Sequence, residues 1–247
     1  MKDIHFISSL PRSGSTLLAT TLNQNPEFRA SIAGPLARYI RAAIEHQNDS
    51  SKNKQLIESI VNTHNYEDKT YFVNNRGLTL LTPIIKQIYP NSKIIVCVRD
   101  INWILDSFEQ LIQKNMLEQT SIFSGQENLN VFTRCETLTR SDRVLGFAYD
   151  SLKQAYYGNE KSMLHFIEYN DLCKNPEKTM KELYKAIGKP YFNHDFNNVF
   201  AKYEEFDDEV RLKDLHTTKQ KLDLYPRKMI IPPQVQDQYR NTEFWRS

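Results

Sequence analysis

The residues best suited to chemistry near the start of the chain form a short polar turn, Pro11-Arg12-Ser13-Gly14-Ser15-Thr16. Its hydroxyl groups can donate hydrogen bonds to an anion, and its arginine adds a fixed positive charge with a planar set of donors. Gly14 lets the backbone approach a ligand closely. An apolar run, Ile4 to Leu10, precedes the turn, and leucines at helical spacing follow it. Unpaired backbone N–H groups at the start of that helix favour anions, so the turn predicts a phosphate site.

The turn is not a Walker A loop, because that loop needs two glycines and a lysine before its hydroxyl residue. Here no lysine stands in that place, and Arg12 precedes the glycine instead. Taken alone, the hexapeptide fits equally well an ordinary Ser-Gly turn that caps a helix. The rest of the chain must therefore decide between the two interpretations.

A second candidate pair follows the strongest strand signal in the chain, Lys93 to Val98. Arg99 comes directly after this apolar run, and ligands of open α/β sheets bind at the carboxyl ends of strands. Ser107 lies eight residues further on, two turns into the helix expected at 101–113. An arginine at a strand end and a hydroxyl on the next helix can converge on one phosphate. The alternative is a loop ion pair between Arg99 and Asp100, with a serine on the helix surface.

The elements that must position these residues alternate along the chain. Strands are expected at 4–10, 69–74, 93–98 and 163–168. Helices are expected at 35–47, 53–63, 77–89, 101–113, 141–157 and 176–187. The alternation predicts an α/β fold with a central, mainly parallel sheet covered by helices on both faces. At 247 residues, we expect one domain over 1–247, with an irregular tail from about 205 that is a candidate lid.

Composition narrows the classes of partner. A formal net charge of +2 is too small to favour a nucleic-acid partner. No apolar run is long enough for a signal peptide or a membrane span. The three cysteines, Cys97, Cys135 and Cys173, have neither metal-ligand nor disulfide spacing. We therefore expect a reducing, cytoplasmic setting.

Taken together, these motifs resemble those of the sulfotransferases that use 3′-phosphoadenosine 5′-phosphosulfate (PAPS). The PRSGST turn is similar to their 5′-phosphosulfate loop, and Arg99 with Ser107 is similar to their 3′-phosphate motif. The segment FIEYNDLCKNPEKTMKELYKAIG resembles a third family motif, whose tyrosine meets the adenine; Tyr169 matches that tyrosine, and Asn170 replaces the usual acid. Tail pieces at 194–199 and 214–219 look like bacterial members. The resemblance thus covers nearly the whole chain and implies a three-layer, P-loop-like fold.

The resemblance implies that a sulfuryl group moves from PAPS to a hydroxyl or amine, releasing adenosine 3′,5′-bisphosphate (PAP). Arg12 would stabilise the charge that grows on the leaving oxygen. No metal ion is expected, because a sulfuryl group carries less charge than a phosphoryl group and no Walker B aspartate is evident. The donor-binding residues that the resemblance implies are Arg12, Ser13, Gly14, Ser15, Thr16, Arg99, Ser107 and Tyr169, with Thr217 and Lys219 as weaker candidates in a closing loop.

The general base does not stand at either of the family's usual positions. Cytosolic members use a histidine beside a lysine after the second core strand, where this chain has Asn74 and Arg76. Arginine cannot act as a base, so Arg76 is a candidate ligand for sulfate or an acidic acceptor instead. Tyrosylprotein sulfotransferases use a glutamate soon after the first helix, and the matching stretch 30–34 has no acid. The first candidate for the catalytic base is His216, followed by His194, Glu45 and Glu109.

The acceptor class stays open between a small molecule, a saccharide and a peptide. The segment 118–135, whose first part, 118–130, is expected to be a loop, and the region after 29 are expected to shape the acceptor side, since they depart most from core patterning. Two other functions are considered. A divergent P-loop kinase would need a lysine in the loop and an acidic metal ligand. A protein that binds PAPS or PAP without catalysis would explain why both usual base positions are unfilled.

These three functions predict different ligand responses. If the chain has a 3′-phosphate site, PAP should raise the melting temperature, because a ligand that binds the folded state stabilises it by mass action. AMP, which lacks the 3′-phosphate, should change the melting temperature little. ATP with Mg²⁺ should raise it only if the protein is a kinase. Thermal-shift measurements with the three ligands check this. Equal shifts with PAP and AMP would contradict a 3′-phosphate site.

Overall fold

In the computed structural model, residues 3–32, 38–39, 41–42, 49–63 and 69–246 are described. Five strands form one sheet in the order β2-β3-β1-β4-β5, and every pairing is parallel. The strands are β1 (Asp3–Ile7), β2 (Phe28–Ala30), β3 (Thr70–Asn74), β4 (Ile94–Val98) and β5 (Leu164–Glu168). The α/β class with a parallel central sheet, expected from the alternating pattern, is confirmed.

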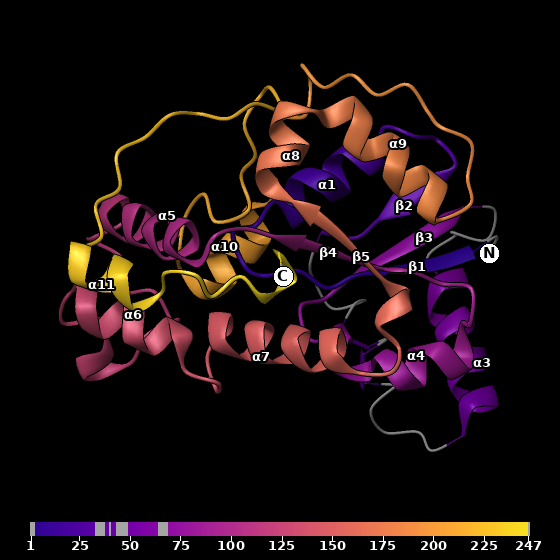
Figure 1. Cartoon of the computed structure of the whole chain (residues 1–247), viewed down its shortest axis with the longest axis horizontal. Coiled ribbons are helices and arrows are strands. Elements are labelled where there is room, and N and C mark those ends of the chain that lie inside the picture. The colour runs from indigo at the N-terminus through magenta and orange to yellow at the C-terminus, as the bar shows by residue number, and fades with distance from the viewer. Residues whose placement is uncertain (1–2, 33–37, 40, 43–48, 64–68, 247) are drawn as a thin grey trace.

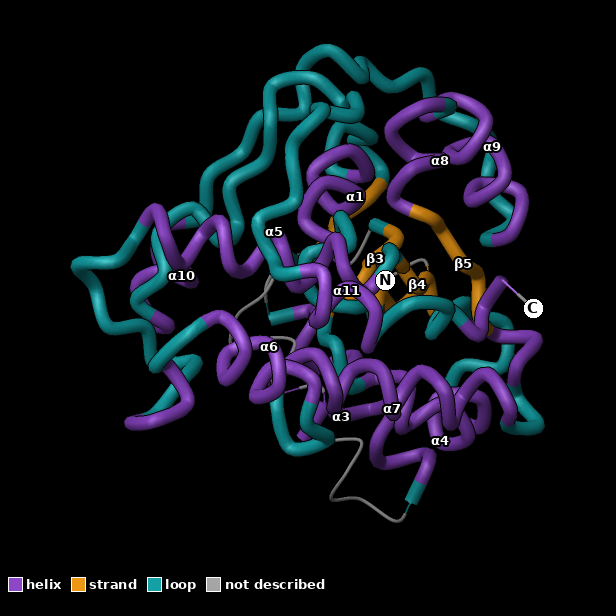
Figure 2. Tube along the Cα trace, turned by 60° about the vertical axis from the view of Figure 1, so that its left-hand side comes forward, coloured by secondary structure: helices purple, strands orange, loops and turns teal. Residues whose placement is uncertain are grey.

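Two apolar cores, one on each face of the sheet, hold the layers together. Successive side chains of a strand point to opposite faces, so Phe6 and Val96 enter one core while Ile7 and Cys97 enter the other. Both faces are covered, which is why the central strands are almost continuously apolar. One face packs against α1 (Ser15–Leu22), α8 (Tyr169–Lys174) and α9 (Pro176–Ala186). The other packs against α3 (Ser50–Asn62), α4 (Thr82–Ile88), α5 (Ile101–Lys114), α6 (Val131–Thr139) and α7 (Val144–Tyr157). Figures 1 and 2 show the two helical layers with the strands between them.

The expected helices are present where they can be checked, with shifted ends. The helix expected at 77–89 divides into a 3₁₀ turn, Leu78–Leu81, and α4, since a proline at position 83 fits only the first turn of an α-helix. The first strand ends at Ile7, but the backbone N–H of Leu10 still donates to the carbonyl of Cys97 at 3.2 Å. The helix expected at 35–47 lies outside the described residues except at 38–39 and 41–42.

Several short elements have no counterpart in the expectations from sequence. They are β2, α6, α8, α10 (Glu204–Val210) and α11 (Pro233–Gln238). The expected loop at 118–130 contains a 3₁₀ turn, Gly125–Asn128, and α6 begins directly after it at residue 131. Its start was readable: the side chain of Asn130 accepts hydrogen bonds from the backbone N–H groups of Phe132 and Thr133, and Thr133 completes a capping box. The others are too short to show a clear period.

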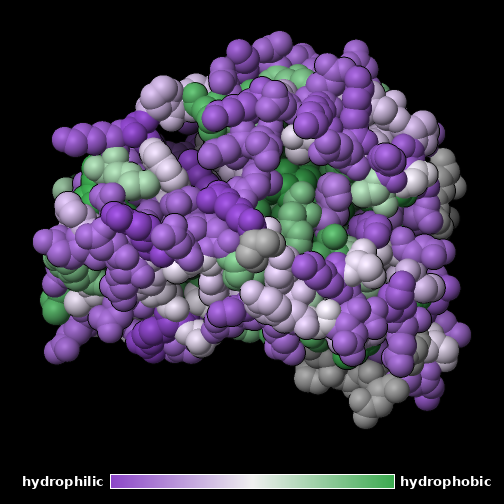
Figure 3. Space-filling view, viewed as in Figure 1, coloured by the Kyte–Doolittle hydropathy of each residue, from purple (hydrophilic) through white to green (hydrophobic). Residues whose placement is uncertain are grey.

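The C-terminal part of the chain returns to the sheet. Figure 1 shows it, in gold and yellow, on the side to which the arrowheads of β4 and β5 point. Its end is anchored to the edge strand, because the indole N–H of Trp245 donates to Glu168 at 2.8 Å. Figure 3 shows the molecule from the same direction as Figure 1. Hydrophilic residues cover most of the visible face, and apolar residues gather in a hollow over β5. No helix in the described part of the chain is long and apolar enough to cross a membrane.

A buried ion pair joins α5 to α6. The Nε and Nη2 atoms of Arg134 donate to the two carboxylate oxygens of Glu109 at 2.8 and 2.6 Å, and the Glu109 side chain is only 2% exposed. Gln113 adds a third hydrogen bond to the same carboxylate, at 3.1 Å. Glu109 does not line the cavity described below. The structure therefore gives this candidate base a role in packing.

Glu109→Gln should lower the free energy of unfolding by about 3–5 kcal/mol, because it leaves the Arg134 guanidinium buried without a counter-charge. Urea unfolding monitored by circular dichroism measures the change. The double variant Glu109→Gln, Arg134→Met should recover much of the loss. A single variant as stable as the wild type would contradict the importance of this ion pair.

Candidate active site

A large cavity, of about 1040 Å³, lies at the carboxyl ends of β1, β3 and β4. Among the described residues, eight arginines and lysines line it against three carboxylates, so it is strongly positive in a chain of net charge +2. Of the donor-binding residues predicted from sequence, all line the cavity except Ser13, and so does His216. This location and charge suit a ligand with several anionic groups.

The turn after β1 has an unusual backbone. Arg12 has φ = 56° and Gly14 has φ = 99°, with Ser13 between them outside the left-handed region. A left-handed conformation costs about 1–2 kcal/mol in a residue other than glycine. Alternation of this kind forms the concave sets of backbone N–H groups that bind anions. The backbone of this turn, next to the start of α1, is therefore of a kind suited to an anion.

The side chain of Ser13 does not face the cavity. Its hydroxyl is fully buried, 2.6 Å from the carbonyl oxygen of Leu10 and 2.7 Å from that of Cys97. It therefore ties the turn to β4 instead of offering a hydroxyl donor to an anion, which corrects one expectation. What remains for Ser13 at the cavity is its backbone N–H group. Ser15 and Thr16 do line the cavity.

Three strand ends meet around the ring of Tyr169. A Cβ atom added at Gly14 would lie 2.9 Å from Cδ2 of Tyr169, so only glycine admits the ring there. The guanidinium carbon of Arg99 lies 4.0 Å from the centroid of the same ring, a cation–π contact. Nη1 of Arg99 also lies 3.5 Å from the carbonyl oxygen of Arg12. The segments that follow β1, β4 and β5 are thus in direct contact with one another.

Arg12 links the turn to α5 and to the C-terminal segment. Its Nε donates to the hydroxyl of Ser107 at 3.1 Å, and its Nη1 donates to the carbonyl of Leu215. Burial, and then the positive charges of Arg99 and Arg227, lower the pKa of Arg12 to about 10. The guanidinium stays charged at neutral pH, but its charge is poorly compensated. An anion beside it would relieve that cost.

Arg227 is a cavity residue that the sequence analysis missed. Its Nη2 donates to the carbonyl of Trp103 at 3.0 Å and lies 3.0 Å from a carboxylate oxygen of Asp106. The other oxygen of Asp106, a side chain with no exposed surface, accepts from the backbone N–H of Ile230 at 2.6 Å. The tail is thereby fastened to α5 next to Ser107. The Arg227-Lys228 pair after Pro226 was the signal available in the sequence.

Unsatisfied donors test whether these residues fit an anionic nucleotide. The Nε atoms of Arg99 and Arg227 are both buried and lack a hydrogen-bond partner within the described residues. Burial also lowers the pKa of both side chains. Buried donors are normally paired, and pairing here requires an acceptor that the cavity can admit. The residues present therefore fit a phosphate-bearing ligand.

His216 is held by a buried carboxylate. Its backbone N–H donates to Oδ1 of Asp207 at 2.9 Å, and its Nδ1 lies 2.8 Å from the same oxygen. Burial lowers the pKa of His216, Asp207 opposes this, and the charges of Arg12 and Arg76 lower it further. The imidazole is thus neutral near pH 7 and fixed in orientation, as a general base requires. Asp207 was not anticipated from the sequence.

Some of the weaker candidates from the sequence line the cavity and others do not. Thr217 and Lys219 line the cavity, and the hydroxyl of Thr217 donates to Asp214 at 3.3 Å. His194 lies away from the cavity among aromatic rings, where burial lowers its pKa to about 4 and its Nε2 lies 3.1 Å from the hydroxyl of Tyr184. Its placement indicates a structural role. Glu45 lies outside the described residues.

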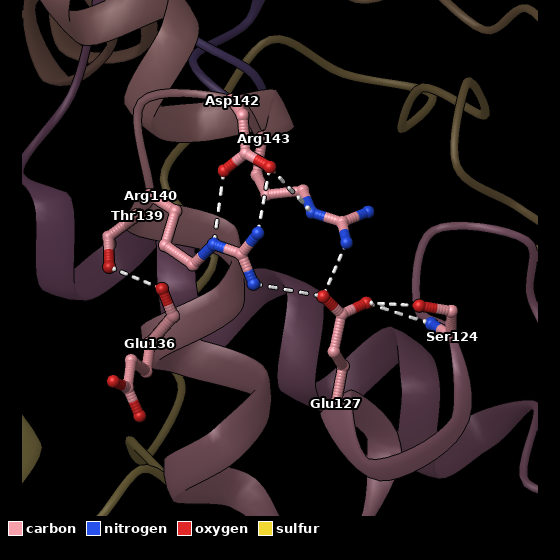
Figure 4. Close-up of polar contacts among 7 residues, drawn as sticks. All are labelled: Ser124, Glu127, Glu136, Thr139, Arg140, Asp142 and Arg143. Carbon is pink, nitrogen blue, oxygen red and sulfur yellow. Dashed lines mark hydrogen bonds and ion pairs between the residues drawn. The ribbon is translucent and has the colours of Figure 1, made fainter.

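Two further arginines that line the cavity have carboxylate partners. Arg38 forms a bidentate pair with Glu209, at 2.9 and 3.1 Å. Arg143 donates to Glu127, and its Nε lies 3.6 Å from Asp142 (Figure 4). Asn74, at the end of β3, is occupied differently: its side-chain amide donates to the carbonyl of Ile32 at 2.9 Å. This amide therefore braces the segment after β2.

Comparison with known proteins matches this geometry. A sequence model described as "Sulfotransferase family" matches residues 5–193, well over half of the chain. The chain belongs to the sulfotransferase family. The matched part of this sulfotransferase includes the turn after β1, Arg99, Ser107 and Tyr169, whereas His216 and Arg227 lie beyond it.

Relatives of this sulfotransferase are distant. It is 22% identical to protein-tyrosine sulfotransferase 2 of Gallus gallus, over 74% of this chain and 50% of that protein, so it spans about half the length of this curated relative. Among solved structures, it resembles a sulfotransferase from Alicyclobacillus acidocaldarius, with a TM-score of 0.55 and 12% identity over 85% of this chain and 92% of that one. It also resembles a mouse sulfotransferase complexed with PAP, with a TM-score of 0.52 and 16% identity over 85% and 64%. These structures share the P-loop-like fold.

Asp207→Asn should lower the pKa of His216 further below 6.5, because the carboxylate that favours the imidazolium is removed while burial and the nearby arginines remain. An NMR titration of the imidazole Cε1–H resonance measures the pKa. Asp208→Asn, on the same helix and exposed, is the matched control and should leave it unchanged. An unchanged or raised pKa in Asp207→Asn would contradict the pairing of these two residues.

Proposed function

We propose that this protein is an active sulfotransferase that moves the sulfuryl group of PAPS to a hydroxyl or amine acceptor and releases PAP. The observation that supports this most is the meeting of the Gly14 turn, Arg99, Ser107 and Tyr169 in one positive cavity. The mouse relative of similar fold that was solved with PAP supports the choice of nucleotide.

The donor would be held at two anion sites and one ring. The turn at 12–16 is suited to the 5′ end, through its backbone N–H groups and the hydroxyls of Ser15 and Thr16. Arg99 and Ser107, with Arg227 added by the structure, are suited to the 3′-phosphate, and the ring of Tyr169 to the adenine. A 3′-phosphate site is what separates PAPS from ordinary adenylates. Thr217 and Lys219 belong to the segment from about 205 that we propose as a lid in a single-domain protein.

The bound donor supplies an activated sulfuryl group, and the residues of the chain provide charge and a base. We propose that Arg12 stabilises the charge on the leaving oxygen, because its guanidinium lines the cavity and is fixed there by hydrogen bonds to Ser107 and Leu215. His216 is placed to take the proton of the acceptor, since it is neutral near pH 7 and Asp207 fixes its orientation. No step in this scheme calls on a metal ion.

The acceptor is proposed as a small molecule, a saccharide or a peptide. The relative from Gallus gallus is named for protein tyrosine, which makes a phenolic hydroxyl one option. The three cysteines are free and buried, which supports the proposal of a reducing, cytoplasmic setting.

Two single substitutions separate catalysis from donor binding. Arg12→Ala should lower kcat by roughly 10²–10³-fold while PAP affinity changes less, because its charge matters most in the transition state. Arg99→Ala should instead weaken PAP binding by roughly 1.5–3 kcal/mol, the loss of a charge-assisted hydrogen bond. Calorimetry with PAP and transfer from labelled PAPS to a panel of acceptors measure both. Normal turnover in Arg12→Ala, or unchanged PAP affinity in Arg99→Ala, would remove that residue from its proposed role.

A further inference from the structure

The strand order sets the order of four residues along the carboxyl edge of the sheet. Arg76 follows β3, Gly14 follows β1, Arg99 follows β4 and Tyr169 follows β5, and these strands are neighbours in that order. Of these four, the three proposed for the nucleotide lie at β1 or on its β4 side. In-line transfer requires the acceptor to approach sulfur from the side opposite the leaving group. The acceptor therefore comes from the β3 side, where Arg76 lies.

Arg76 differs from two other arginines of the cavity, Arg38 and Arg143, in its ion pairing within the described part of the chain. Arg38 and Arg143 are paired with carboxylates, whereas within the described residues no carboxylate lies within ion-pair distance of Arg76. Its side chain lines the cavity and is reached by solvent there, yet the surrounding protein lowers its pKa by desolvation. A cation held in this way is stabilised when an anion binds beside it.

His216 connects Arg76 to the reaction. The positive charges of Arg76 and Arg12 both act on its imidazole, while the cations that act most on Arg12 are Arg99 and Arg227. The proposed base therefore feels the charge of Arg76 as well as that of Arg12, and all three residues line the same cavity. A group bound at Arg76 would lie close to the base that accepts the acceptor's proton.

We propose that Arg76 is an anion subsite for the acceptor, so that the acceptor carries a carboxylate or phosphate group near its nucleophilic hydroxyl or amine. This inference rests on the proposed function. In the transfer, the acceptor atom forms a bond to sulfur and its proton passes to His216. The bond between sulfur and the 5′-phosphate oxygen breaks, and its electron pair leaves with PAP. Arg76 takes no part in these bond changes and determines which acceptor is held.

Matched probes that differ only in charge test the subsite. They are 4-hydroxyphenylacetate against 4-hydroxyphenylacetamide, and glucose 6-phosphate against glucose. Binding to the PAP-saturated protein is measured by calorimetry, and transfer from labelled PAPS by kcat/KM. In the wild type, the charged member of at least one pair should be favoured tenfold or more. In Arg76→Gln that ratio should fall to near one, while Arg76→Lys should keep part of it.

Arg240→Gln is the matched control, since Arg240 pairs with Asp237 at an exposed site and the net charge changes equally. It should retain the wild-type ratio. The proposal is overturned by equal affinity for charged and neutral probes in the wild type, or by an unchanged ratio in Arg76→Gln. An equal fall in kcat/KM for both members of a pair also overturns it and assigns Arg76 to the sulfuryl group. Failure of the wild type to bind PAP would count against the proposed function instead.

Discussion

Desolvation of clustered arginines is the constraint on which the site depends. Burial lowers the pKa of Arg12, Arg99 and Arg227, and the nearby positive charges lower the pKa of Arg12 and Arg99 further. Among the three, and within the described residues, only Arg227 is paired with a carboxylate. Such a cluster is unfavourable by itself, because desolvation and like charges both oppose it. The folded structure tolerates the cluster because a different element holds each side chain. Arg12 follows β1, Arg99 follows β4, and Arg227 is held by Asp106 on α5. A polyanion that binds there would therefore offset the unfavourable electrostatic free energy of the cluster.

The fold provides the rigidity that this arrangement needs. All five strands are parallel and their carboxyl ends share one edge, so short turns after β1, β3, β4 and β5 reach one cavity. The buried hydroxyl of Ser13 donates to the carbonyl of Cys97 and so fastens the turn after β1 to β4. Left-handed residues at 12 and 14 curve the backbone of the turn. Positioned backbone donors lose little entropy when a ligand binds, which favours binding and transfer alike.

The C-terminal segment completes the cavity from a different direction. Asp106 on α5 holds both Arg227 and the backbone of Ile230, and Asp207 on α10 holds His216. Two buried carboxylates thus fix one cation and one imidazole that the core of the sheet does not supply. The positions at which the family usually has its catalytic base carry no base here, and Arg76 stands near one of them, at the end of β3. A base supplied by the C-terminal segment, His216, is consistent with that change. The acceptor side would then differ from that of relatives while the donor side is kept.

From the sequence alone, the local patterns were sufficient to predict which residues of the proposed donor side line the cavity, apart from Ser13 and Arg227. A strand, a Gly-containing turn and a helix form a local unit, and an arginine directly after an apolar strand must lie at the carboxyl edge of a parallel sheet. Strand order, the inward direction of the Ser13 hydroxyl and the pairs Asp106–Arg227 and Asp207–His216 were decided only by the tertiary structure. The contact between Asp106 and Ile230 joins residues 124 positions apart. No period or motif marks such a contact, because the two segments meet only after the sheet has brought them together.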